Sequence, residues 1–480
     1  MTATYSDPLP APVDHVGWRR LEHRLQGRLY LPDDDGYDVV RRAWNLRAQH
    51  RPAGVVVAEN PDDVRRSVEF ASGHGLGVAV MATGHGTGNP CDATGLLINT
   101  CRLRRTAVRA GSRTAVVSAG TRWQQVIDAA APHGLAGLAG SSPSTGVVGS
   151  SLGGGFGWLG RKFGLASGSL TRAEVVTAGG ELRYVSAEQE PELWWGLRGG
   201  TGNFGIVTGL GLRLQLVARV YAGNLYYPLG RAAEVLGFFA DWTRGIPDDL
   251  TAAATFRSFP ALPTIPHQLR GKSFVAVRGC WSGDPAEGAP VINRARRALG
   301  PATVDTFSTV PAAALAQVSM DPVDPLPALN HTDLLTDLTD ETIATLVDLA
   351  GPSAHSPLVM VEVRQLGGAL TSHPDELSPM AHSTARFTLN AIGSTPTRAQ
   401  DHAVREHLTH LAREIRPHAA GATYLNFLDT DGTRPDRVAA AYSARDLRRL
   451  RRLKQHLDPT DIFRFNRNIP APPTWNEESS

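Results

Sequence analysis

A run of glycine residues between positions 140 and 157 limits what this chain can fold into more than any other feature. It reads Gly-Ser-Ser-Pro-Ser-Thr-Gly-Val-Val-Gly-Ser-Ser-Leu-Gly-Gly-Gly-Phe-Gly. Each glycine in a helix or strand costs conformational entropy, so the run suits a loop whose backbone approaches a ligand or adopts positive φ. Turned amide groups of this kind bind anions, and a diphosphate-bearing cofactor is the usual ligand. A flexible linker is the alternative, but Leu152, Phe156 and Trp158 are buried-type side chains and favour a ligand-binding loop.

Two further segments point to the same kind of ligand. His85 lies between glycines in Ala82–Gly88, directly after a predicted strand at Val78–Met81. A histidine taken alone is most often a hydrogen-bonding residue. The second segment, Leu197–Thr208, is glycine-rich and opens into a strand in which leucine alternates from Leu210 onward. Two glycine loops and a glycine-flanked histidine suit a ligand longer than a single phosphate.

One motif in the glycine run is misleading. Residues 155–160 match GxGxxG, the fingerprint of nucleotide binding in Rossmann folds. No apolar strand precedes them, and bulky residues stand where a Rossmann turn begins its helix. We therefore disfavour an NAD-linked dehydrogenase.

The pattern of apolar residues predicts two domains, as expected for 480 residues. Strands, helices and glycine loops alternate up to residue 216, which includes a predicted hairpin at Gly179-Gly180. Residues 217–421 have an α+β pattern, with helices predicted at Arg231–Arg244, Glu341–Leu349 and Arg398–Ile415. Residues 422–480 return to the first domain. A helix in that return carries a leucine stripe and five basic residues, which we interpret as a solvated face: Arg448, Arg449, Arg451, Arg452 and Lys454.

Composition excludes several classes of function. The net charge is +2, which gives no electrostatic case for nucleic acid or an anionic membrane as the main partner. There is no stretch of 18 apolar residues and no targeting segment, so we expect a cytoplasmic protein. The three cysteines form no CxxC pair, and we expect neither a disulfide framework nor a metal site.

Taken together, these stretches resemble the berberine-bridge-enzyme-like flavoprotein oxidases of the vanillyl-alcohol-oxidase superfamily. The resemblance extends over nearly the whole chain, and the order and spacing of its segments make it specific. Besides the three loops above, the segments that carry it are Gly27–Tyr37, Arg42–Asn45, Arg51–Val57, Leu366–Leu370, Tyr424–Phe427 and Asp458–Asn468.

The resemblance implies an α+β fold of the two-domain vanillyl-alcohol-oxidase type. Its PCMH-type FAD-binding domain would be formed by residues 1–216 and 422–480. The substrate domain, 217–421, would present a mainly antiparallel sheet, covered by helices, to the isoalloxazine. The FAD-binding residues that the resemblance implies are Ala82, Thr83, Gly84, His85, Gly86, Thr87, Gly140, Ser141, Ser142, Gly146, Gly149, Gly205, Ile206, Val207, Asn426 and Asn468.

His85 matches the histidine that family members link covalently to the 8α carbon of the flavin. Bicovalent members add a cysteine in a Gly-x-Cys-Pro setting, where this chain has Ser142. Because a serine cannot form that thioether, we predict at most one covalent link, through His85. A second departure is Phe427, which replaces the last tyrosine of a Tyr-x-Asn-Tyr motif.

The catalytic residues implied are Tyr424, Glu362 and Arg364. Tyr424 matches the motif tyrosine and would take a proton while a hydride leaves the substrate carbon; its ordinary pKa of about 10 requires help from its surroundings. Strand alternation over Leu358–Gln365 places Glu362 and Arg364 on the face opposite the valines. There Arg364 could stabilise a tyrosinate or an anionic substrate, although a surface ion pair with Glu362 is an alternative.

The leading hypothesis is an FAD-dependent oxidase of an alcohol, hemiacetal or phenolic group in a specialised metabolite or sugar, with oxygen as acceptor and hydrogen peroxide as product. One alternative is a flavin-dependent monooxygenase on the same scaffold. Another is a non-redox cyclase that retains FAD as a scaffold. The sequence identifies neither the substrate nor the oligomeric state.

Overall fold

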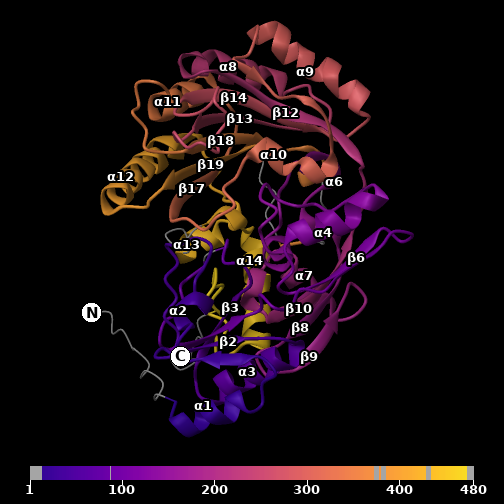
Figure 1. The fold of residues 1–480 in the computed structure, drawn as a ribbon, viewed down its shortest axis with the longest axis vertical. Helices are drawn as coiled ribbons and strands as arrows, with labels where there is room; N and C mark the ends of the chain where they lie inside the picture. The colour runs from indigo at the N-terminus through magenta and orange to yellow at the C-terminus, as the bar shows by residue number, and fades with distance from the viewer. Residues whose placement is uncertain (1–12, 87, 372–377, 380–384, 429–433, 473–480) are drawn as a thin grey trace, which may run out of the picture.

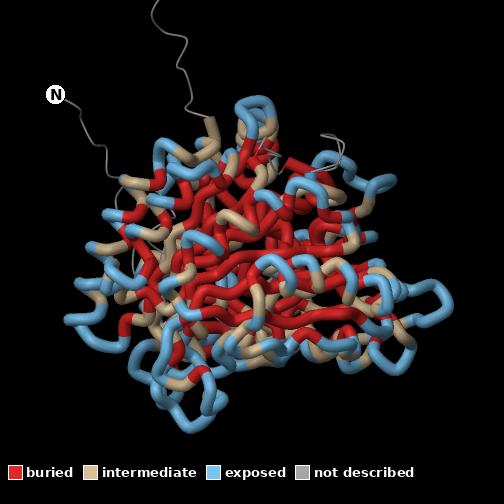
Figure 2. The backbone as a smooth tube through the Cα atoms, turned by 90° about the horizontal axis from the view of Figure 1, so that it is seen from above, coloured by how far each residue is buried: buried red, intermediate tan, exposed pale blue. Residues whose placement is uncertain are grey.

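The computed structural model describes residues 13–86, 88–371, 378–379, 385–428 and 434–472. One end of the elongated molecule is a large sheet with helices, and the other holds two smaller sheets, of four and five strands; the C-terminal segment, in yellow, runs among these smaller sheets (Figure 1). Within the described residues, a fourth sheet has only two strands. The buried residues lie inside and the exposed ones at the periphery (Figure 2).

The first small sheet contains the strand that leads to His85. Its order is β1 (Arg28–Tyr30), β2 (Gly54–Val57), β4 (Gly95–Asn99) and β3 (Gly77–Met81), of which the last three are parallel. Helix α3 (Pro61–Gly73) begins where Asn60 accepts a hydrogen bond from the Asp63 amide, with proline at the first position. Its Val64 and Val68, four residues apart on one face of the helix, are fully buried.

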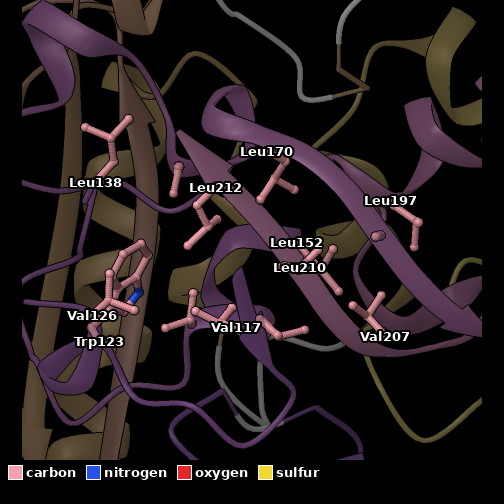
Figure 3. Close-up of a cluster of buried hydrophobic side chains, with 14 of the residues drawn as sticks. Val117, Trp123, Val126, Leu138, Leu152, Leu170, Leu197, Val207, Leu210 and Leu212 are labelled. Carbon is pink, nitrogen blue, oxygen red and sulfur yellow. The ribbon is translucent and has the colours of Figure 1, made fainter. Parts of the chain in front are cut away.

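The second small sheet is antiparallel and carries the core beneath the glycine run. Its order is β5 (Thr106–Arg109), β6 (Thr114–Ser118), β10 (Ile206–Arg213), β8 (Leu170–Val176) and β9 (Leu182–Val185). The pairing of β8 with β9 confirms the predicted hairpin. Side chains of β10 lie in one apolar cluster with those of α4 (Trp123–Ala130) and α5 (Val147–Leu152), among them Leu210 and Leu212 (Figure 3).

The large sheet is antiparallel throughout. It contains β15 (Val304–Asp305), β12 (Arg219–Pro228), β14 (Ser273–Trp281), β13 (Leu250–Ser258), β18 (Met360–Gln365), β19 (Phe387–Ser394) and β17 (Ala328–Leu335) in that order, with β16 (Ser308–Pro311) also paired to β12. Helices cover one face (Figure 1): α8 (Ala232–Trp242), α9 (Pro285–Leu299), α11 (Asp340–Ala350) and α12 (Arg398–Ile415). This arrangement confirms the predicted antiparallel substrate-domain sheet.

Strand β18 shows how one segment serves both faces of that sheet. Val361 and Val363 pack among apolar side chains of the covering helices, as the alternation predicts. Glu362 and Arg364 consequently point to the opposite face, which lies toward the smaller sheets.

The C-terminal return contains α14 (Ala444–Leu457), which Ser443 caps through the Asp446 amide. Leu450 and Leu453 are buried, as the leucine stripe predicts. The prediction that all five basic residues lie on a solvated face is wrong for Lys454, whose side chain is completely buried. A carboxylate four residues later, Asp458, makes that burial possible.

The short elements complete the chain. They are α1 (His15–Glu22), α2 (Tyr37–Val40), β7 (Leu135–Ala136), α6 (Gly160–Phe163), α7 (Pro191–Leu197), β11 (Gln215–Leu216), α10 (Ala316–Ser319) and α13 (Pro435–Ala439). The GxGxxG match lies between α5 and α6, and not between a strand and a helix as a Rossmann turn requires. Among the helices described, none is both long and apolar enough to cross a membrane.

The domain boundaries at 216/217 and 421/422 stay a prediction. Just before the 216/217 boundary, Gln215 and Leu216 pair with β7. On its other side, β12 of the large sheet begins at Arg219.

Candidate functional site

The loop that carries His85 is tightly fixed by the residues around it. Gly84 has φ +74°, and a Cβ there would lie 2.5 Å from the Cα of Ala43, so only glycine fits. The imidazole of His85 stacks on Trp44, with 4.2 Å between ring centroids and 16° between planes. Its Nε2 lies 2.9 Å from Oγ of Ser144, and that oxygen lies 2.8 Å from Oγ of Ser142. The ring is therefore held on one face and at one nitrogen.

The surroundings of His85 keep its ring neutral. Burial lowers its pKa to about 4; the positive charge of Arg122 acts in the same direction, and Asp321 opposes it. At neutral pH the imidazole accordingly has one N–H and one free lone pair. A neutral imidazole of this kind can act as a nucleophile.

The His85 loop and the glycine run lie against each other. The Gly146 amide donates to Oγ1 of Thr83 over 3.3 Å, and a Cβ on Gly146 would lie 3.6 Å from that of Ala82. Ser144 makes the second link through His85. The structure thus brings together the predicted binding residues of both loops; Thr87 lies outside the described residues.

The glycines of the run are of two kinds. A Cβ on Gly153 would lie 1.9 Å from Oδ1 of Asn426, and one on Gly157 would lie 1.8 Å from the Ala139 carbonyl oxygen, so both are needed for packing. On Gly149 an added Cβ would meet no described atom within 4 Å, and on Gly140 only the Phe156 carbonyl oxygen at 3.9 Å. These open positions, the latter next to Ser141, leave the backbone accessible to a ligand.

The third predicted segment lies at the start of β10. Gly205 has φ +148°, and a Cβ there would lie 2.7 Å from the Val176 carbonyl oxygen. Ile206 and Val207 pair with Val176 and Val175, so one edge of this segment is committed to the sheet. Its glycine is required by that close approach to β8.

Asn203 ties this segment to the C-terminal return. Its side chain is fully buried, donates to the Arg467 carbonyl oxygen over 3.1 Å and accepts from the Ile469 amide over 2.9 Å. Asn468 donates to Asp461, whereas its Oδ1 is buried and accepts no hydrogen bond within the described chain. Oδ1 of Asn466 is in the same state. Buried acceptors of this kind require a partner such as a bound ligand or water.

Tyr424, like the other two predicted catalytic residues, is buried. It is 6% exposed, and its hydroxyl has no hydrogen-bond partner among the residues that the structure describes. Its ring makes an edge contact with Phe156 at 6.0 Å between centroids and another with Phe427 at 4.8 Å. Burial raises the pKa of Tyr424, an effect that the side chains of Asn426 and Arg364 and nearby backbone amides partly offset.

Glu362 and Arg364 form a buried ion network with a third residue, Arg278. Oε1 of Glu362 accepts two hydrogen bonds from Arg364, at 3.0 and 2.6 Å, and Oε2 accepts one from Arg278 at 2.7 Å. All three side chains are at least 95% buried. Although burial acts to raise the pKa of Glu362, the two guanidinium groups hold it below its ordinary value. The surface ion pair considered from sequence is therefore wrong: the pair is buried.

The arginine of this network reaches the glycine run through aromatic rings. The guanidinium carbon of Arg364 lies 4.5 Å from the ring centroid of Trp158 and 5.0 Å from that of Phe156. Phe156 in turn touches Tyr424. The large sheet and the glycine run therefore meet at Phe156, between Arg364 and Tyr424.

Sequence reasoning missed three residues of this site: Arg278, Ser144 and Trp44. Arg278 lies two strands away from Glu362 in the sheet order β14-β13-β18, which periodicity does not reveal. Ser144 and Trp44 belong to segments that carry the resemblance, but only the folded geometry brings them to His85. An arginine within an otherwise apolar strand is the one signal that could have marked Arg278.

The residues present fit the FAD that the sequence implies. The glycine run leaves backbone accessible at Gly140 and Gly149, and the neutral His85 lies against that run through Ser144. Buried acceptors on Asn466 and Asn468 and the buried Tyr424 hydroxyl lack partners within the described chain. A long ligand with polar groups along its length would satisfy such atoms.

Comparisons with known proteins indicate the same cofactor, FAD. The family model for the FAD binding domain matches residues 52–186, and the model for berberine and berberine-like proteins matches residues 423–470. An FAD-linked oxidoreductase of Dictyostelium discoideum is 26% identical over 451 residues, which cover 93% of this chain and 95% of that protein. The (R)-6-hydroxynicotine oxidase of Paenarthrobacter nicotinovorans is 35% identical over 202 residues, which cover 42% of this chain and 44% of that protein.

Solved structures show the same fold. 6-Hydroxy-D-nicotine oxidase from Arthrobacter nicotinovorans has a TM-score of 0.80 at 23% identity, covering 93% of this chain and 98% of that one. Berberine bridge enzyme from Eschscholzia californica has 0.81 at 17%, covering 96% and 100%. Wild-type Phl p 4.0202, a glucose dehydrogenase, has 0.81 at 19%, also covering 96% and 100%. The predicted two-domain α+β fold is thereby confirmed.

Proposed function

We propose that this chain, which belongs to the berberine-bridge-enzyme-like family of FAD-linked oxidoreductases, is an oxidase. It removes a hydride from an alcohol, hemiacetal or phenolic group of a small specialised metabolite or sugar. The electrons pass to oxygen and give hydrogen peroxide. The observation that carries this proposal is the buried hydroxyl of Tyr424, which has no partner within the described chain and lies near Arg364.

FAD, when bound, supplies the hydride acceptor. The residues of this chain that would hold it are the loop at Ala82–Gly86, the open glycines Gly140 and Gly149, and the buried amides of Asn466 and Asn468. His85 would make a single covalent link, since Ser142 has no thiol. These assignments rest on the family resemblance and on the fit described above.

Tyr424 receives the substrate proton in this proposal. Because burial raises its pKa, the phenol is protonated at neutral pH, and only its ionised form can accept a proton. Arg364 and the side chain of Asn426 favour that ionised form. The rate of substrate oxidation should therefore rise with pH into the alkaline range, since deprotonation of Tyr424 precedes proton acceptance.

Glu362 and Arg278 act through Arg364 and do not touch the reacting atoms. The two hydrogen bonds that Arg364 donates to Oε1 of Glu362 fix the orientation of the guanidinium beside Phe156. Arg278 shares the same carboxylate, so the network of three residues carries one net positive charge. That surplus charge stabilises an anion nearby, either the Tyr424 phenolate or an acidic group of the substrate.

The test of this function is anaerobic reduction of the protein-bound flavin by a panel of sugars and of polyketide and alkaloid alcohols. A reducing substrate should then yield one hydrogen peroxide per turnover in air. Peroxide well below that ratio with an oxygenated product would instead indicate a monooxygenase. Reduction in the absence of oxygen followed by slow reoxidation would indicate a dehydrogenase, the activity of the Phl p 4 relative. If no panel member bleaches the flavin, a non-redox cyclase is favoured.

The role of Tyr424 has its own test. Tyr424→Phe keeps the ring and its contacts but removes the hydroxyl, so anaerobic flavin reduction should slow by about 100-fold or more. It should also remove the alkaline rise in the rate. Phe427→Tyr is the matched control, because it adds a hydroxyl in the same segment and should leave the pH profile in place. An unchanged rate in Tyr424→Phe would exclude the tyrosine from proton transfer.

A further inference from the structure

The hydrogen-bonded chain behind His85 has no role in the function proposed so far. It consists of Nε2 of His85, Oγ of Ser144 and Oγ of Ser142, with contacts of 2.9 and 2.8 Å. We propose that Ser144 is a positioning residue for covalent flavin attachment: with Ser142 behind it, Ser144 fixes the His85 ring and takes up the proton that Nε2 releases. This inference rests on the proposed link through His85.

The contacts engage one ring nitrogen of His85 and leave the other without a hydrogen bond from the described chain. Nε2 is engaged with Ser144, whereas no hydrogen bond to Nδ1 occurs within the described chain. If Nε2 carries the proton and donates it to Ser144, the lone pair lies on Nδ1. Ser144 can then donate its own hydrogen to Ser142. In this proposal Nε2 is the donor to Ser144, so Nδ1 keeps the lone pair and is the nucleophile.

The backbone around Ser144 is well anchored. The Trp123 amide donates to the Thr145 carbonyl oxygen over 3.0 Å, and the Gln124 amide donates to that of Pro143 over 2.8 Å. Both donors lie in the first turn of α4, which has few other partners for them. The Ser144 hydroxyl is thus presented from a fixed turn to the imidazole.

Trp44 holds the ring from its face. Its indole stacks on His85, and its Nε1 donates to the Val323 carbonyl oxygen over 3.1 Å. The tryptophan is therefore fixed between the first small sheet and a segment that leads into β17. Rotation of the imidazole away from Ser144 would break the stack as well as the hydrogen bond.

The attachment reaction needs this proton path. A C–H bond of the 8α methyl group breaks and a bond from Nδ1 to that carbon forms, so the methyl group and the imidazole each lose one proton. The two electrons released pass through the flavin to oxygen, the acceptor that the proposed oxidase already uses, and give hydrogen peroxide. The imidazole proton on Nε2 passes through Ser144 to the partly exposed Ser142 and from there to water. The methyl proton is also released to water, and the reduction of oxygen to hydrogen peroxide takes up two protons in all.

This proposal gives Ser142 a second role. It occupies the position at which bicovalent members of the family carry a cysteine. In this chain that position extends the hydrogen-bonded chain behind His85. The low pKa of His85, caused by burial and Arg122 and opposed by Asp321, keeps the ring unprotonated so that Nδ1 can react.

The experiment compares covalent attachment in four proteins: wild type, Ser144→Ala, Ser144→Thr and Ser142→Ala. Apoprotein is mixed with FAD in air, and covalent flavin is followed over time by fluorescence in denaturing gels. Ser144→Ala should attach FAD about 100-fold more slowly. Ser144→Thr, which keeps the hydroxyl, should stay within a few-fold of wild type, and Ser142→Ala should lie between. The dissociation constant for FAD before attachment should change by less than about threefold in Ser144→Ala and Ser144→Thr.

The pH profile separates a proton-conducting role from a merely structural one. In Ser144→Ala the attachment rate should rise steeply with pH because solvent hydroxide must remove the proton, whereas wild type should depend on pH weakly. Equal rates and profiles in wild type and Ser144→Ala would overturn the role of Ser144 while leaving the link itself intact. Wild-type protein that binds FAD and never attaches it would overturn the covalent link and this role together, but not the oxidase function. A fluorescent His85→Ala band would show that another residue is the anchor.

Discussion

At the scale of single residues, the site contains buried groups that are neutral and one buried carboxylate that stays charged. Burial suppresses the charge of His85 and of Tyr424, and so both rest in their neutral forms. Glu362 keeps its charge because two arginines share it. Burial thus leaves the imidazole of His85 and the phenol of Tyr424 uncharged, whereas the two arginines keep the buried carboxylate of Glu362 ionised.

Removing the Glu362 charge should be costly. Glu362→Gln keeps the shape of the side chain but leaves Arg278 and Arg364 buried without a counter-charge, so the free energy of unfolding should fall by about 3–5 kcal/mol. Urea unfolding followed by circular dichroism measures the loss. Glu234→Gln on the exposed surface of α8 is the matched control and should leave the unfolding curve unchanged. A Glu362→Gln curve that coincides with wild type would contradict the role given to this carboxylate.

The pH dependence of that effect follows from the direction of the shift. The folded-state pKa of Glu362 lies below its ordinary value of 4.5, so its contribution is fully present above about pH 4.5 and is lost as the pH falls through the lowered pKa. The stability difference between wild type and Glu362→Gln should therefore be constant from pH 5 to 8 and shrink in more acidic buffer. Unfolding curves across this range measure it. A difference that grows with acidity would mean that the pKa is raised.

At the scale of elements, α14 shows how a basic helix is anchored in the core. Lys454 donates to the carboxylate of Asp458 over 2.6 Å and to the carbonyl oxygens of Asn203 and Phe463. The loop before β10, the helix and the segment after it are therefore joined by one ammonium group. The remaining basic residues include the exposed Arg448 and Arg452.

Replacing that ammonium group tests the anchor. Lys454→Met keeps much of the aliphatic stem but leaves Asp458 buried and unpaired, so the free energy of unfolding should fall by about 3–5 kcal/mol. Arg448→Ala on the exposed face of the same helix should change it by no more than about 0.5 kcal/mol. Chemical denaturation of both variants gives the comparison. Equal free energies of unfolding for the two variants would contradict the anchoring role of Lys454 and favour the solvated position expected from sequence.

At the scale of the whole molecule, Asn45 joins two parts of the protein. It lies in the loop before β2 of the first small sheet and binds the first residue of β17 in the large sheet. It is buried, donates to the Ala328 carbonyl oxygen over 3.0 Å and accepts from the Ala328 amide over 3.2 Å. Its neighbour Trp44 binds the same stretch at Val323. Trp44, which stacks on His85, and its neighbour Asn45 therefore also bind the segment that begins the last strand of the large sheet.

Cutting this attachment should loosen the segment before β17. Asn45→Ala leaves both polar groups of Ala328 without their partner, which costs about 1–3 kcal/mol. Limited proteolysis should then cleave the stretch around residues 321–327 faster than in wild type. Gln49→Ala, an exposed side chain in the same loop, should leave the cleavage rate unchanged. Unaltered cleavage in Asn45→Ala would show that other contacts hold the two parts together.

How much the sequence predicts depends on the range of the interactions. Local periodicity predicted α12 with its bounds, because apolar stripes are set by neighbouring residues. It also put Glu362 and the valines on opposite faces of β18. It could not pair Glu362 with Arg278, which depends on the order of strands far apart in the chain. Nor could it bury Lys454, because a helix stripe does not reveal a carboxylate folded back from beyond the helix end.

The near-contact between Gly153 and Asn426 has a consequence for how this protein can change. An atom added at position 153 would occupy the space of the Asn426 amide, which also holds the Ser150 carbonyl oxygen. A larger residue at 153 can be tolerated only together with a smaller one at 426, although the two stand far apart in the chain. Diversification of the glycine run is thus constrained by the C-terminal segment, and grafting either segment alone from a relative should fail where grafting both succeeds.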